Sequence, residues 1–158
     1  MAKLNIPDDE ATAALMYMQR CLAMLRMWDW DIILSDDAAD ENNNGEVNAY
    51  DNLRYIATLY LPNDWPEKPT SVKQSTLLHE CLHIAHVHPE QVIRSLKDQS
   101  ALSVDLFDSM MTQFIAGMEY MVDKLTRVFC ELDVLPKWPT KAEIAKTDLG
   151  TTIKGGTL

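Results

Sequence analysis

The segment TSVKQSTLLHECLHIAHV, residues 70–87, decides which fold this chain adopts. It predicts a helix in which His79 and His83, four residues apart, lie one turn apart on the same face. Both imidazoles can then reach a single metal ion, and tetrahedral zinc with histidine nitrogens suits that spacing. Glu80 follows the first histidine and lies at the edge of that face. A carboxylate at this position can serve as the general base toward a metal-activated water molecule.

The residues around the motif set the limits of this helix. Thr70 or Ser71 can cap its first turn, and Pro89 disfavours helical geometry at His88, so the helix is expected to end there. Four apolar residues supply its buried side: Leu77, Leu78, Leu82 and Ala85. The alternative interpretation is that two surface histidines fall at helical spacing beside an incidental glutamate.

A catalytic zinc ion needs a third protein ligand and one open position. His86 lies about 10 Å along the helix axis from His79, too far for both to bind one ion. His88 could reach the ion only through a sharp turn. Glu119 borders the apolar stripe of a later helix, where it either reaches water or needs a partner, because unpaired burial is costly. A metal ion would be that partner, and Asp123, one turn later, is placed to hydrogen-bond a ligating histidine.

These motifs resemble a known family. HECLH, followed 36 residues later by the glutamate of GMEYMVD, is similar to the gluzincin metallopeptidases, of which thermolysin is the best known. The resemblance implies that His79, His83 and Glu119 bind one zinc ion per chain, that Glu80 is the general base and that Asp123 orients a ligating histidine. The minimal, single-domain minigluzincins and small phage-encoded HExxH proteins are the most similar forms.

The resemblance leaves some roles open. Larger gluzincins stabilise the tetrahedral intermediate with a histidine or tyrosine from a second subdomain, for which this chain is too short, and none of its tyrosines is assigned that role. In small HExxH proteins the strand before the motif helix lies along the cleft, which would here be residues 55–61. In minimal gluzincins a chain terminus occupies the cleft, and the segment 133–158 could do the same or be a mobile tail.

The remaining periodicities predict an α+β fold. Residues 1–132 are expected to form one metallopeptidase-like domain, and residues 133–158 an irregular tail. A long C-terminal helix should present this apolar stripe: Phe107, Met111, Ile115, Met118, Val122, Leu125 and Phe129. The expected elements are an N-terminal helix at 7–27, about three antiparallel strands at 28–34, 47–50 and 54–61, the motif helix, a short helical stretch at 89–96, and the long helix at 102–132.

Composition excludes several classes of partner. The 158 residues carry a net charge of -10, which argues against nucleic acid and anionic membranes as partners. The N-terminus has no apolar signal segment, and no apolar run approaches the roughly 18 residues that span a bilayer, so a cytoplasmic protein is expected. Three cysteines, Cys21, Cys81 and Cys130, have no framework spacing and are interpreted as buried free thiols.

Two functions are compatible with these residues. The first is a zinc-dependent peptidase that acts on a peptide or protein substrate through a metal-activated water and Glu80. The second is a non-catalytic zinc-containing interaction or regulatory protein, although a purely structural site is usually closed by four ligands and has no use for Glu80. A DNA-repair or repressor-cleaving protease is disfavoured by the acidic composition. The substrate, the oligomeric state and the metal's identity beyond zinc stay open.

Overall fold

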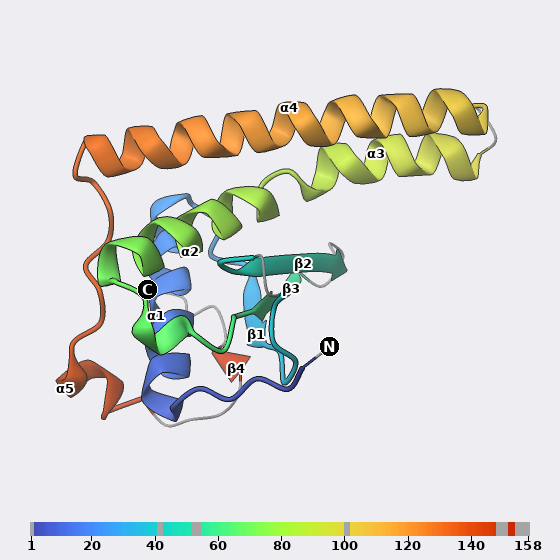
Figure 1. Ribbon diagram of the computed structural model, residues 1–158. Helices are drawn as coiled ribbons and strands as arrows, with labels where there is room; N and C mark the ends of the chain where they lie inside the picture. The colour runs from blue at the N-terminus through green and yellow to red at the C-terminus, as the bar shows by residue number, and fades with distance from the viewer. Residues whose placement is uncertain (1, 41–42, 52–54, 100–101, 148–151, 154–158) are drawn as a thin grey trace.

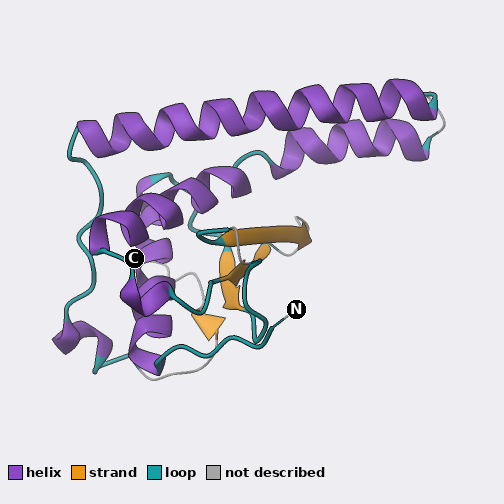
Figure 2. Cartoon of the chain, viewed as in Figure 1, coloured by secondary structure: helices purple, strands orange, loops and turns teal. Residues whose placement is uncertain are grey.

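The computed structural model describes residues 2–40, 43–51, 55–99, 102–147 and 152–153 of the chain (Figure 1). Helices make up most of it, and the strands gather in one small sheet (Figure 2). The elements follow in the order α1 (Asp8–Met24), β1 (Asp31–Leu34), β2 (Glu46–Asp51), β3 (Ile56–Tyr60), the 3₁₀ turn η1 (Trp65–Glu67), α2 (Thr70–Ile84), α3 (Val87–Asp98), α4 (Val104–Glu131), α5 (Lys141–Ile144) and β4 (Thr152–Ile153). The predicted α+β class is confirmed.

The sheet is mixed, whereas the sequence analysis predicts an antiparallel one. Its strand order is β2-β3-β1-β4. β3 runs parallel to β1 and antiparallel to β2, and β4 pairs antiparallel with β1. Alternation of apolar residues reveals a strand but not its direction. The connection from β1 to β3 includes the whole of β2, and this length allows the parallel pairing.

The core lies between the sheet and helices α1 and α2. Met18 of α1, Leu59 of β3 and Leu77 of α2 are completely buried within it. Each such side chain contributes on the order of 1.5–3 kcal/mol through burial. At the edge of this core, Lys73 Nζ of α2 lies 2.7 Å from the Glu10 carboxylate of α1. The leucines of α2 therefore anchor this helix in the core. The face that carries the histidines points toward α4.

The break between α2 and α3 differs from the prediction. α2 ends at Ile84, and His88 and Pro89 lie in the first turn of α3. A proline is tolerated in a first turn because its missing N–H would have no intrahelical partner there. The break lies instead at Ala85 and His86, where the main chain turns before α3 begins.

α4 is the longest helix, and its predicted apolar stripe is only partly buried. The Ser103 side chain caps its first turn by accepting a hydrogen bond from the Leu106 N–H. Phe107, Met111 and Val122 are buried as expected, but the other predicted stripe residues are at least partly exposed. α4 packs along α2 and α3, and the α3–α4 pair extends beyond the sheet (Figure 1).

The segment after α4 contains more structure than an irregular tail. Thr140 and Glu143 form a capping box at the start of α5, and the Arg20 guanidinium of α1 pairs with Glu143 at 2.6 Å. The Trp138 ring lies 5.1 Å from the Tyr17 ring, centroid to centroid. β4 then joins the edge of the sheet opposite β2. The described tail residues thus lie beside α1 and β1, and residues 148–151 and 154–158 are outside the described part of the chain.

Two further predictions concern membrane-spanning helices and cysteines. Among the described residues, no helix is both long and apolar enough to cross a membrane. Cys21 and Cys81 are buried free thiols as predicted, whereas Cys130 is exposed.

Candidate metal centre

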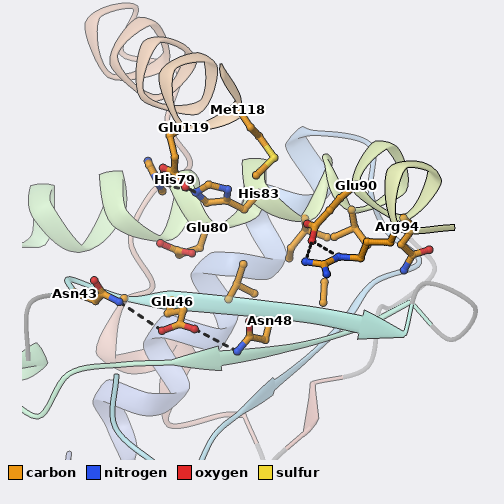
Figure 3. A pocket seen from close by; sticks show the side chains of 16 residues that line it. Asn43, Glu46, Asn48, His79, Glu80, His83, Glu90, Arg94, Met118 and Glu119 are labelled. Carbon is orange, nitrogen blue, oxygen red and sulfur yellow. Dashed lines mark hydrogen bonds and ion pairs between the residues drawn. The ribbon is translucent and has the colours of Figure 1, made fainter. Parts of the chain in front are cut away.

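His79 and His83 lie side by side on α2, as their spacing predicts. Their Nε2 atoms are 2.9 Å apart, and their ring centroids are 4.6 Å apart. Both rings lie on the side of α2 that faces α4 (Figure 3). Burial lowers the pKa of His83 below its ordinary value, and this effect is opposed by the nearby Glu119 carboxylate. A neutral imidazole is the form that binds a metal ion.

Glu119 of α4 completes a group of three. One of its carboxylate oxygens lies 3.7 Å from His79 Nε2, and the other lies 3.5 Å from His83 Nε2. The candidate ligand atoms of the three residues all lie within 4.8 Å of one another. Tetrahedral zinc with bonds of about 2.0–2.1 Å needs ligand atoms about 3.3 Å apart, which is close to these separations. His79, His83 and Glu119 can therefore hold a metal ion.

The reason for expecting Glu119 is only partly correct. Its side chain is 50% exposed, so burial alone does not demand a partner. What places it beside the histidines is the packing of α4 across α2. Glu119 belongs to the group as predicted, but the crossing of the two helices brings it there.

Asp123 contacts the other side of the His79 ring. Its Oδ1 lies 3.3 Å from Nδ1 of His79, the nitrogen that points away from the three-residue group. A carboxylate at this nitrogen holds it as the donor and leaves Nε2 free to bind a metal. This is the contact that the sequence analysis expects of Asp123.

Glu80 is buried between α2 and β2 (Figure 3). Burial raises the pKa of this carboxyl to about 8, although the Val47 backbone N–H donates a hydrogen bond to it and opposes the rise. The carboxylates of Glu119 and Glu46 raise the pKa further. Within the described chain no cation is paired with Glu80, so its neutral form is favoured, and a cation bound beside it would lower the pKa.

The site opens into a cavity of about 650 Å³. Strand β2 forms one wall, α2 and α3 form another, and Met118 and Glu119 of α4 close the top (Figure 3). β2 is an edge strand, whereas β3, the strand predicted to lie along the cleft, is paired on both sides. The prediction is wrong about the strand because sheet order does not follow from the order along the chain.

A second cavity, of about 420 Å³, lies on the other side of Glu80. The two cavities share Asn43, Gly45, His79 and Glu80 in their walls. The second continues past Asp123 to Thr126, whose buried hydroxyl oxygen has no hydrogen-bond partner among the described residues. Space therefore extends from the candidate general base in two directions.

Several cavity residues were not anticipated from the sequence. The Glu46 carboxylate accepts hydrogen bonds from the side-chain amides of Asn43 and Asn48, at 3.5 and 3.3 Å. On the opposite wall, the Arg94 guanidinium is paired with the Glu90 carboxylate. The motif helix gives no signal for these residues, since they come from β2, the loop before it and α3, and only the fold brings these segments beside α2.

The other candidates of the sequence analysis lie outside the group. His86 Nδ1 contacts the Leu82 carbonyl oxygen at 2.7 Å within its own turn. His88 is exposed on α3. Tyr120 points to solvent with 65% exposure, and no tyrosine in the described ranges lines either cavity. The Tyr50 side chain lies outside the described part.

Comparison with known proteins assigns no family to this chain. No protein family, curated protein or solved structure matches the chain. The function must therefore be inferred from the arrangement of the side chains alone.

Proposed function

We propose that this protein is a zinc-dependent peptidase. The proposal is carried by one observation: two histidine nitrogens and a carboxylate from a second helix converge beside a buried glutamate at the junction of two cavities. A structural zinc site would usually have four protein ligands. Three candidate ligands leave a fourth position for water or substrate.

The chemistry of the three ligands favours zinc. Two neutral imidazoles and one carboxylate are the ligand set of many catalytic zinc sites, and the His79 ring is held by Asp123 through its other nitrogen. In the described chain no cysteine belongs to this group, because Cys81 points into the core, where its sulfur lies 3.7 Å from the Met18 carbonyl oxygen.

Glu80 would carry the proton transfers of the reaction. A zinc ion held by these ligands would polarise the scissile carbonyl and make a water molecule more acidic. Glu80 would take a proton from that water as the water oxygen attacks the carbonyl carbon, and would then deliver the proton to the leaving amine nitrogen when the C–N bond breaks. Hydrolysis consumes one water molecule and regenerates the Glu80 carboxylate.

The position of β2 supports an extended peptide as the substrate. β2 lies at the edge of the sheet and lines the larger cavity from Glu46 to Ala49. An extended peptide can add to such an edge through main-chain hydrogen bonds. Bound along β2, it would pass Glu80, which the Val47 N–H contacts.

This proposal agrees with the resemblance to gluzincins, in which HExxH on one helix is completed by a glutamate on a later one. It differs from their larger members because no residue is assigned to stabilise the oxyanion. Arg94, whose guanidinium lies in the wall of the larger cavity, is paired with Glu90 and is given no such role.

The second candidate, a non-catalytic zinc protein, is favoured by the half-exposed Glu119 carboxylate alone. A non-catalytic function does not explain why a glutamate is buried beside the candidate ligands at position 80. The two functions are separated by Glu80→Gln, which should keep zinc under either function and lose hydrolysis only under the first.

The test measures zinc content and hydrolysis of an unstructured protein such as casein for three purified variants. Glu80→Gln should bind about one zinc per chain and lose about 10²–10⁴-fold in rate. Glu119→Gln should lose both zinc and activity. Glu131→Gln, which changes an exposed glutamate at the far end of the same helix, should retain both. Zinc binding without any Glu80-dependent hydrolysis would favour the non-catalytic function.

A further inference from the structure

α4 carries a second apolar stripe beside the one that packs on α2 and α3. It consists of Met110, Phe114, Gly117, Met121, Leu125, Val128 and Leu132, the last being the C-cap of the helix. The spacings along the chain are four, three and four residues, and then the same again. Such an 11-residue repeat keeps a stripe on one face of a nearly straight helix, so these positions form one continuous line about 33 Å long.

Much of this stripe is exposed. Met121, Leu125, Val128 and Leu132 are 51%, 37%, 47% and 65% exposed, respectively. The described elements packed on α4 are α2 and α3, and no other one lies along its outer side (Figure 1). A contiguous apolar line on one helix face indicates a contact with another protein chain.

Gly117 lies in the middle of the stripe, and nothing in the described part of the chain requires a glycine at this position. A Cβ atom added there would meet nothing within 4 Å. A glycine inside a helix costs about 1 kcal/mol relative to alanine. A close approach by a second helix would account for a residue without a side chain at this position.

We propose that this stripe pairs with the same stripe of a second copy of the chain, with the two α4 helices antiparallel. The spacings are the same in both directions from Met121. A two-fold axis at Met121 therefore places Gly117 opposite Leu125 of the second copy, and Phe114 opposite Val128 of the second copy. Each glycine then faces a leucine and each valine faces a phenylalanine, which suits close packing, while Met121 faces its own copy and Met110 faces Leu132 of the second copy.

The parallel arrangement lacks this complementarity. In register, it would place Gly117 against Gly117 of the second copy and Phe114 against Phe114 of the second copy. The first pair leaves a gap and the second is crowded, and both cost packing energy. The choice of the antiparallel pair thus follows from the sizes of the side chains.

Charge also favours this face as the contact. The chain has a net charge of -10, so two copies repel each other unless their acidic groups are kept apart. None of the seven stripe positions is charged. Glu119 lies about 160° around the helix from Met121, and Asp123 lies on the same side as Glu119. The pairing therefore brings together an uncharged line and leaves the candidate metal centre open.

The test is the molar mass in solution, by light scattering or sedimentation, over a range of micromolar concentrations. The wild type should approach twice the 18.0 kDa of one chain. Gly117→Glu should remain at the mass of one chain, because the new side chain has open space in the monomer but meets Leu125 in the pair. Ala116→Glu, an exposed neighbour about 140° from the stripe centre, adds the same charge and should remain dimeric.

Crosslinking tests the direction of the helices in a Cys130→Ser background, which removes the exposed thiol. Met121→Cys should form a disulfide between copies on mild oxidation, because this position faces itself across the two-fold axis. Leu125→Cys should not, because it faces Gly117 of the second copy. A wild type that stays at the mass of one chain overturns the proposal and leaves the stripe to a different protein. Efficient crosslinking through Leu125→Cys overturns the antiparallel register.

Discussion

Asp123 is expected to act on the metal centre through His79. Its Oδ1 lies 3.3 Å from the Nδ1 of that ring. Asp123→Ala removes the acceptor that fixes the tautomer, so zinc affinity should fall about 10–100-fold while the three ligands remain. Competition with a chromophoric chelator measures this change. Asp108→Ala, an exposed aspartate nearer the start of α4, is the matched control, and equal affinities in the two variants would exclude this role for Asp123.

At the scale of single residues, the sequence predicts the group of side chains that could hold a metal ion. His79 and His83 follow from the four-residue repeat of a helix, which needs no knowledge of the tertiary fold. Glu119 follows from its place beside an apolar stripe, although its carboxylate is half exposed. Glu46 and Arg94 could not be predicted, because only the packing of β2 and α3 around α2 brings them to the cavity.

Helix α5 is attached to the rest of the molecule by a contact that depends on pH. Hydrogen bonds from the backbone and side chain of Thr140, and then from Arg20, lower the pKa of Glu143 from 4.5 to about 2. Because the folded pKa is the lower one, the carboxylate contributes stability above about pH 4.5 and loses that contribution as the pH falls toward about 2.

Glu143→Gln should therefore be less stable than the wild type at neutral pH, and the difference should shrink as the pH falls below 4.5. Thermal unfolding followed by tryptophan fluorescence measures this, since Trp138 lies between α4 and α5 and packs on Tyr17. Glu131→Gln changes a nearby exposed glutamate and should show no such pH-dependent difference. A constant difference across this pH range would show that the Glu143 charge does not hold α5.

At the scale of elements, the sequence predicts which segments are helices and strands but not how they pair. The period of the apolar residues marks α1, α2 and α4 within a few residues of their observed ends. It carries no information on strand direction, so the parallel pairing of β1 with β3 was not predicted. The stripe on α4 was predicted as core, yet Ile115 and Leu125 are exposed, because α2 and α3 cover only one side of that helix.

At the scale of the whole molecule, the fold brings together two regions that are distant in the sequence. α2 supplies the histidines and Glu80, and α4 supplies Glu119 and Asp123 from across the crossing of the two helices. The sheet contributes its edge strand β2 as the wall of the larger cavity. Among the described elements, only α2 and α3 pack along α4, and the proposed pairing with a second copy uses its opposite side, so the proposed dimer and the proposed active site occupy separate faces.

The central claim is that His79, His83 and Glu119 bind zinc, and X-ray absorption at the zinc edge of the loaded protein tests it most directly. The structure predicts nitrogen and oxygen neighbours only, at about 2.0–2.2 Å, with the multiple scattering of two imidazoles. Glu119→Gln should weaken or abolish the bound zinc. A sulfur neighbour at about 2.3 Å would place a cysteine on the metal and contradict the account. So would an unchanged spectrum in the Glu119→Gln variant.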